Sequence, residues 1–217
     1  VSKTLDEEPA LDIMLTQTQA LGSTANVFYS KRNEKFGVSL YGSGHYQKAY
    51  DPEDDDFSNL PKTTSISFNP KFFYYPSEKT TFWFGLNGTY DDRIGGDITK
   101  IESGENGIHQ YTEENVSKRL SSQAVYETQI DSVSSLTIKN SISFFDRELT
   151  IPDFTFDGKQ TNTFTEINYQ KSANKTDWIF GANLYTSDFD ENDNATLQRD
   201  QTDITYGAFA NNIYDIS

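Results

Sequence analysis

The stretch Thr80-Thr81-Phe82-Trp83-Phe84-Gly85-Leu86-Asn87-Gly88-Thr89-Tyr90 decides the fold, because the character of its side chains alternates from one residue to the next. Phe82, Phe84, Leu86 and Tyr90 share one face. Thr81, Trp83, Asn87 and Thr89 share the other. Successive side chains of a β-strand point to opposite faces, so this alternation predicts a strand with one apolar and one more polar face. We therefore predict a strand over about 80–93 that separates two different environments.

The same period of two continues along almost the whole chain. Further apolar sets are Phe36, Val38 and Leu40; Ile66, Phe68 and Phe72; Ala124, Tyr126 and Ile130; Leu136, Ile138, Ile142 and Phe144; and Trp178, Phe180, Ala182 and Leu184. We expect strands at about 11–18, 23–32, 35–48, 63–75, 80–93, 112–130, 134–149, 161–171, 176–188 and 201–214. Apolar residues nowhere recur with the period of a helix, so helix should be nearly absent and the fold class is all-β.

The expected connections are of two kinds that alternate along the chain. Short polar turns are predicted at 33–34, 76–79, 131–134 and 172–175, and longer links at about 49–62, 94–111, 150–160 and 189–200. Short turns at one end, long loops at the other and strands of roughly 11 to 15 residues are typical of outer-membrane barrels. A soluble sandwich has shorter strands and mixed loops at both ends. We predict an antiparallel up-and-down meander, a segment of a transmembrane β-barrel.

The aromatic residues support this interpretation. They make up 14% of the 217 residues, although only 35% are hydrophobic, and a soluble domain has about 45–50% apolar residues, glycine included. The rings gather near expected strand ends, as at 72–75, at 144–145, and at Tyr46 and Tyr50. Rings with polar tips are stable where hydrocarbon meets headgroups. We therefore expect aromatic girdles in contact with outer-membrane lipid.

Composition excludes several classes of function. The chain has no cysteine, which removes disulfides, thiolate metal sites and cysteine nucleophiles. Its net charge of -15 and pI near 4.4 argue against a nucleic-acid partner, which needs clustered Lys and Arg. No run of 18 apolar residues offers a transmembrane helix. The start at Val1 lacks a charged and apolar leader, so we expect a removed signal peptide or an internal piece.

Several stretches resemble the TonB-dependent receptors of the outer membrane, in the form common in the Bacteroidetes. The matching stretches are Leu11-Asp12-Ile13-Met14-Leu15, Asn26-Val27-Phe28-Tyr29-Ser30, Gln47-Lys48-Ala49-Tyr50-Asp51-Pro52, Asn69-Pro70-Lys71-Phe72-Phe73-Tyr74-Tyr75-Pro76, Gly88-Thr89-Tyr90-Asp91-Asp92-Arg93-Ile94-Gly95-Gly96-Asp97 and Asn140-Ser141-Ile142-Ser143-Phe144-Phe145-Asp146-Arg147-Glu148. The likeness runs through almost the whole chain.

The resemblance implies that residues 1–217 are about ten strands of a 22-stranded barrel, with the plug domain and the remaining strands absent. It also implies active import across the outer membrane of a Gram-negative bacterium. The ligand would be a scarce nutrient such as an iron chelate (siderophore), cobalamin, a glycan or a peptide. Energy would come from the TonB complex, acting through the missing plug.

The acidic loop Asp51-Pro52-Glu53-Asp54-Asp55-Asp56 is the one candidate metal site. Asp51, Glu53 and Asp55 present carboxylates at alternate positions, and Ca²⁺ prefers several hard oxygen ligands. The glycine and the distal glutamate of a calcium loop are missing from the expected spacing. A solvated loop is therefore favoured over a Ca²⁺ site, and the same holds for the second acidic loop, 188–194. No other cofactor is expected.

No catalytic constellation is evident, so we do not expect an enzyme. His45 and His109 are the only histidines, and neither lies in a triad or metal-pair spacing. Glu127, Lys139 and Glu166 are expected to face a water-filled interior. Two alternatives to an energised receptor stay open: a passive porin or surface-binding barrel, and a soluble all-β binding protein.

Overall fold

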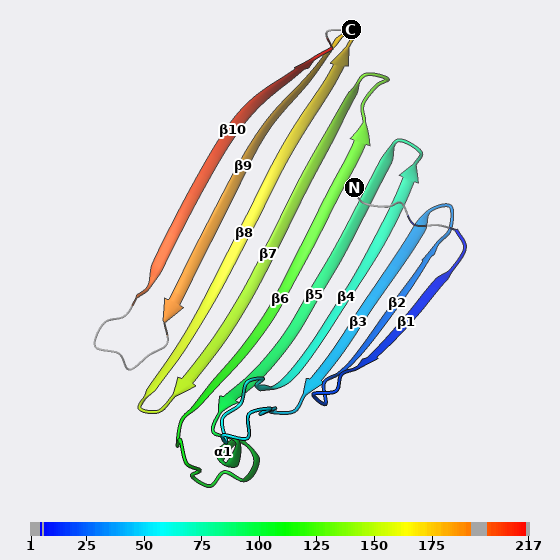
Figure 1. Ribbon diagram of the computed structural model, residues 1–217. Coiled ribbons are helices and arrows are strands. Elements are labelled where there is room, and N and C mark those ends of the chain that lie inside the picture. The colour runs from blue at the N-terminus through cyan, green and yellow to red at the C-terminus, as the bar shows by residue number, and fades with distance from the viewer. Residues whose placement is uncertain (1–4, 6, 192–198, 216–217) are drawn as a thin grey trace.

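The computed structural model describes residues 5, 7–191 and 199–215. Their strands form one antiparallel sheet in which each strand pairs with its neighbours in chain order (Figure 1). The strands are β1 (Ala10–Gln17), β2 (Ser23–Arg32), β3 (Phe36–Gln47), β4 (Lys62–Ser77), β5 (Thr80–Gly96), β6 (Thr112–Gln129), β7 (Ser134–Ile151), β8 (Phe154–Ala173), β9 (Thr176–Glu191) and β10 (Gln201–Tyr214). The predicted all-β meander of ten strands is confirmed.

Helix is confined to α1 (Ile98–Ser103) within the described residues. It lies in the loop between β5 and β6, as Figure 1 shows. No helix in the described part of the chain is long and apolar enough to cross a membrane.

The connections differ at the two ends of the sheet. The turns at 33–35, 78–79, 130–133 and 174–175 are all short and lie at one end, which we name the turn end. The links at 48–61 and 97–111 lie at the opposite end, the loop end (Figure 1). From β4 onward the strands have 14 to 20 residues. They are longer than the roughly five to six residues usual in globular proteins.

The prediction of a long link at 150–160 is wrong. β7 continues to Ile151 and β8 begins at Phe154, so only Pro152 and Asp153 join them. Asp153 has a φ of 63°, a left-handed conformation that Asp tolerates well, and proline favours the preceding position of a tight turn. The polar residues that suggested a loop belong to the strand: Lys159, for example, pairs with Asp146 across β7 and β8.

The sheet has no second layer to cover it in the described residues. Among these residues only Ala20 and Val125 are buried hydrophobic side chains. The chain exposes 14467 Å², whereas a compact monomer of 24.6 kDa would expose about 10,000 Å². A soluble sandwich buries its apolar faces between two sheets. The apolar face of this sheet must therefore be covered by something outside the described chain.

Candidate functional site

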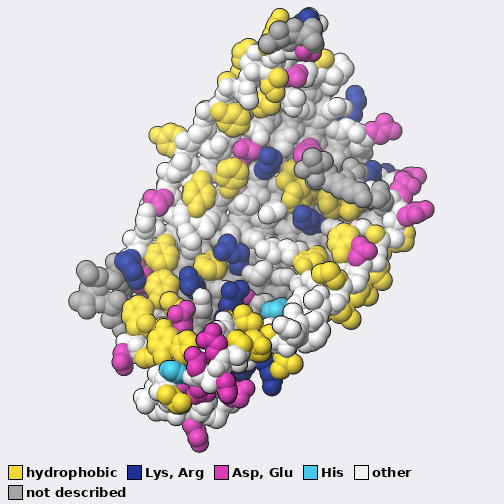
Figure 2. Space-filling model, viewed as in Figure 1, with side chains coloured by type: hydrophobic (Ala, Val, Ile, Leu, Met, Phe, Trp, Pro, Cys, Tyr) yellow, Lys and Arg dark blue, Asp and Glu magenta, His cyan; other side chains and the backbone are white. Residues whose placement is uncertain are grey.

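The sheet has two faces of different character. The outer face carries Phe82, Leu86 and the residues in register with them, and many of these are large, apolar and exposed. The alternate residues, including Thr81, Trp83 and Asn87, form the inner face. Figure 2 looks onto the hollowed side of the sheet, where Lys and Arg side chains are scattered over the floor. The predicted separation of an apolar from a polar face is therefore present.

A row of four rings crosses β3–β6 on the outer face near the turn end. Phe36 pairs with Tyr74, Tyr74 with Phe82, and Phe82 with Tyr126. Residues directly opposite each other point to the same side of a sheet, so the four rings are neighbours. The rings of Phe36 and Tyr74 stack with their centroids 5.2 Å apart.

A second group of rings lies on the outer face toward the loop end. Its members are Tyr46 on β3, Tyr90 on β5 and Phe144 on β7. On β3, Tyr46 lies ten positions after Phe36, and ten steps of about 3.3 Å in a strand tilted by about 40° span about 25 Å. We name the outer-face residues between the two ring groups on β3–β7 the outer band; none of them is charged. The first charges beyond it are Asp92, Lys118 and Asp146.

The inner face holds the charges expected there. Glu127, Lys139 and Glu166 all lie on this face, because their registers place them with Thr81 and Trp83. Lys139 Nζ donates to Glu166 Oε1 at 3.0 Å, and Asn168 Nδ2 donates to the same oxygen at 2.8 Å. The sequence predicted that these three residues lie on the inner face. The cross-strand register shows in addition that Lys139 pairs with Glu166.

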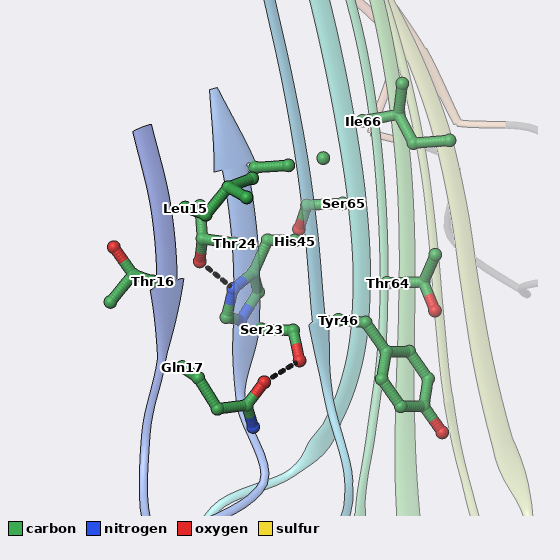
Figure 3. Close-up of a pocket in the computed structure, with 12 residues that line it drawn as sticks. Leu15, Thr16, Gln17, Ser23, Thr24, His45, Tyr46, Thr64, Ser65 and Ile66 are labelled. Atoms are coloured by element: carbon green, nitrogen blue, oxygen red, sulfur yellow. Dashed lines mark hydrogen bonds between the residues drawn. The ribbon is translucent and has the colours of Figure 1, made fainter. Parts of the chain in front are cut away.

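A hollow of about 510 Å³ opens where β1–β4 approach the loop end (Figure 3). Thr24 Oγ1 and His45 Nδ1 point toward each other there, 2.8 Å apart, and Ser23 Oγ donates to Gln17 Oε1 at 2.5 Å. The partner of the His45 ring in this contact is a hydroxyl and not a carboxylate. The pair therefore resembles a structural hydrogen bond on the polar inner face.

The two long loops at the loop end form one ordered unit, which we name the loop cap (residues 50–60 and 97–111). Ile98 N donates to Asp56 O at 3.0 Å, and Ser58 N donates to Gly96 O at 2.8 Å. His109 Nε2 lies 2.8 Å from Asp55 O. Backbone hydrogen bonds thus join the loops, which would otherwise be independent.

Asp97 organises the loop cap from its centre. Its side chain is fully buried and accepts backbone N–H bonds from Lys100 (2.9 Å), His109 (2.8 Å) and Gln110 (3.1 Å). Burial alone would raise the pKa of Asp97, but the three N–H bonds and the nearby His109 outweigh it, so this pKa lies below its usual value. Asp97 is therefore a charged structural anchor.

Rings cover one side of the loop cap. Phe57 stacks on Tyr111 with centroids 6.4 Å apart and meets His109 edge-on at 5.3 Å. Beside them Ile108 is 80% exposed. The loop cap thus offers rings and an apolar side chain beside a strongly acidic loop.

The predicted metal ligands Asp51, Glu53 and Asp55 are not brought together as a ligand set. Asp51 instead accepts backbone N–H bonds from Glu53, Asp54 and Asp56 at 2.8–3.0 Å, which fold the loop around its own carboxylate. Among the residues that the structure describes, no group of three or more His, Cys, Asp or Glu side chains could hold a metal ion. The second acidic loop falls partly on 192–198, outside the described residues.

Two features had no clear signal in the sequence. Asp97 is one acid among many, and only its burial distinguishes it. The inner-face cations Arg32, Lys71 and Arg119 lie over the rings of Tyr75, Trp83 and Phe145. Each of these contacts joins two strands, so residue spacing along one strand cannot reveal it.

A single antiparallel sheet with an apolar outer face and a polar, hollowed inner face is a segment of β-barrel wall, not closed within the described residues. No protein-family model matches the chain, and no curated protein matches its sequence. Among solved structures it is similar to a chain titled "Copper transporter OprC", with a TM-score of 0.54 and 8% sequence identity. The match covers 100% of this chain and 44% of that chain, so this chain spans less than half of its neighbour. At this identity the likeness shows the fold alone.

Proposed function

We propose that this chain is part of the barrel wall of an outer-membrane receptor that imports a scarce nutrient with energy supplied through TonB. The observation that carries the proposal is the outer band, which is uncharged on β3–β7 and bounded by rings at both ends. Its height of about 25 Å equals that of the lipid-facing band of outer-membrane barrels. The outer band would then contact the lipid of the outer membrane of a Gram-negative bacterium.

The open edges of the sheet support a larger barrel. β1 and β10 each have one neighbour in the sheet. In hydrocarbon, unpaired backbone groups cost several kcal/mol each, so further strands must close the wall. Ten strands are slightly under half of a 22-stranded barrel, and the chain covers 44% of its structural neighbour. A plug domain elsewhere in the full-length protein would connect this barrel to TonB.

The family resemblance and the name of the structural neighbour suggest the candidate ligands. An iron chelate, cobalamin and a glycan are the candidates from the resemblance, and the name of the neighbour adds copper. A strain that lacks the gene for the full-length protein should lose growth when one of these is limiting. Restoring the gene should restore growth.

A passive porin is the second candidate, because a polar, hollowed inner face also suits a water-filled pore. Energy dependence separates the two. Uptake by the restored strain should stop when TonB is deleted or when a protonophore collapses the inner-membrane gradient. Uptake that continues under both treatments would replace the receptor proposal with the porin.

A further inference from the structure

Three cationic side chains of the inner face, those of Arg32, Lys71 and Arg119, lie over aromatic rings. The distances to the ring centroids are 4.0 Å for Arg32 Cζ over Tyr75, 5.1 Å for Lys71 Nζ over Trp83 and 4.4 Å for Arg119 Cζ over Phe145. In the described part of the chain none of the three forms an ion pair, whereas Lys139 pairs with Glu166 and Arg93 with Asp91. A ring holds a cation in position without neutralising its charge.

Two of these cations flank a continuous array of rings. Phe73 stacks on Tyr75 with centroids 6.3 Å apart and lies 6.2 Å from Trp83. Arg32 covers the Tyr75 end and Lys71 the Trp83 end. We name Arg32, Tyr75, Phe73, Trp83 and Lys71 the ring array.

Arg32 also has a hydrogen-bond donor without an acceptor. Its Nε is buried, and no partner lies within reach among the described residues. A buried donor is costly to leave unpaired. The ring array therefore presents two positive charges that no ion pair neutralises, and one of them, Arg32, also carries a buried N–H without an acceptor.

The acidic residues of this chain lie mostly elsewhere. Despite the net charge of -15, most of them lie in the loops, in the turns, at strand ends and on the outer face. Examples are Asp51, Glu53, Asp54, Asp55, Asp131, Asp146 and Glu148. On the inner face Asp91 and Glu166 pair with Arg93 and Lys139, and Glu127 lies diagonally across from Trp83. Charges of one sign on a low-dielectric wall focus the field and concentrate ions of the opposite sign. The two cations of the ring array outnumber the Glu127 carboxylate beside it, so this part of the inner face should attract anions although the whole chain repels them.

We propose that the ring array is a binding surface for a small anionic solute that carries carboxylate or phosphate groups. The guanidinium of Arg32 and the ammonium of Lys71 receive the anionic oxygens, and the rings contact the apolar part of the solute. The proposal rests on the proposed function, because only in a barrel does this face line a path across the membrane.

The two tryptophans of this chain allow a direct test in the full-length protein, once every tryptophan outside this chain has been replaced by phenylalanine. Trp83 belongs to the ring array, whereas Trp178 lies on the outer face and is 41% exposed. In a Trp178→Phe variant in detergent micelles, each quenching constant of Trp83 is divided by that of free N-acetyltryptophanamide with the same ion. The resulting iodide-to-caesium ratio should be at least three at equal ionic strength. Millimolar citrate or inorganic phosphate should reduce the iodide quenching, and neutral maltose should not.

Arg32→Gln with Lys71→Gln, added to Trp178→Phe, should bring the iodide-to-caesium ratio close to one. Lys118→Gln removes a charge from the outer face beyond the outer band and is the matched control, which should leave the ratio unchanged. Heat-modifiable migration on gels shows whether each variant has folded. If the double variant does not fold, the single Lys71→Gln variant replaces it and should halve the ratio. A normalised ratio near one in the Trp178→Phe variant, a ratio insensitive to Lys71, or no protection by citrate and phosphate would overturn the proposal.

A second measurement separates this proposal from the proposed function. In a Trp83→Phe variant, brominated detergent should quench Trp178 strongly, and the same detergent should leave Trp83 of the Trp178→Phe variant largely unquenched. Failure of Trp178 to be quenched contradicts the lipid-facing outer band and hence the barrel proposal. Failure of the iodide asymmetry alone contradicts only the anion surface.

Discussion

The carboxylate of Asp97 occupies the space that a side chain at Gly107 would need. A Cβ built on Gly107 would lie 2.1 Å from Asp97 Oδ1 and 2.5 Å from Oδ2. Because three backbone N–H groups hold this carboxylate, it cannot move away without breaking them. Glycine at 107 is therefore a requirement of the loop cap.

Gly107→Ala should open the loop cap while leaving the sheet intact. Overpacking of this kind costs about 1–3 kcal/mol, so proteolysis within 97–111 should accelerate about tenfold, with unchanged β-sheet circular dichroism. Gly88→Ala is the matched control, because a Cβ at Gly88 would meet nothing within 4 Å. Equal proteolysis of the two variants would mean that the loop cap tolerates a side chain at 107.

Acid should loosen the loop cap through Asp97. Its folded-state pKa lies below the ordinary 3.8, so the carboxylate stabilises the folded loop cap fully above that pH. The stabilisation is lost as the pH falls through the lower folded-state pKa. Hydrogen exchange at the amides of Lys100, His109 and Gln110 should therefore rise relative to the strands below pH 3.8.

Asp97→Asn should flatten this dependence and raise the exchange at neutral pH. An amide offers one acceptor oxygen where the carboxylate offers two. An unchanged acid response in Asp97→Asn would assign the pH dependence to another group.

The ion pair between Lys139 and Glu166 should contribute little to stability. The side chains of Lys139 and Glu166 are 45% and 17% exposed, and partly exposed pairs contribute about 0.2–1 kcal/mol. A double-mutant cycle with Lys139→Met and Glu166→Gln, measured by urea unfolding in detergent, should give a coupling energy in this range. A coupling above about 2 kcal/mol would show that the inner face is far drier than its exposure indicates.

The sequence predicted the faces of this sheet well because a strand fixes the side of every residue. Phe82 and Leu86 are apolar and Asn87 is polar, and these three residues determine which face of β5 is the outer one. The neighbouring strands must pair in a register that places their own apolar residues on the same face. The turn at Pro152 and Asp153 was missed because Asp157 and Lys159 suggested a loop. Both charged side chains lie on the outer face, closer to the loop end than the uncharged outer-face residues. Alternation shows which face a residue is on, but not how far along the strand the lipid-facing part extends.

The loop cap and the ring array were less predictable for a different reason. Asp97 meets Gly107 and His109, and Lys71 meets Trp83, only because distant segments come together in space. The acidic stretch from Asp51 suggested metal ligands because carboxylate spacing resembles that of a calcium loop. The backbone instead folds around Asp51 and uses its carboxylate. Local spacing cannot distinguish a carboxylate that binds a cation from one that receives its own loop's N–H groups.

The strongest test of the two faces uses adjacent residues of β5. Leu86 lies in the middle of the outer band and is 38% exposed, and Asn87 lies beside it on the inner face. A lysine at the bilayer midplane of a barrel costs about 2–4 kcal/mol, whereas substitutions facing the interior are tolerated. Leu86→Lys should therefore lower the free energy of unfolding in lipid vesicles by about that amount, and Asn87→Lys should change it by less than about 1 kcal/mol. The two variants add the same side chain one residue apart, so the added lysine and the change in net charge are the same in both. Equal losses would mean that the outer band does not meet hydrocarbon, and the barrel proposal would fail with it.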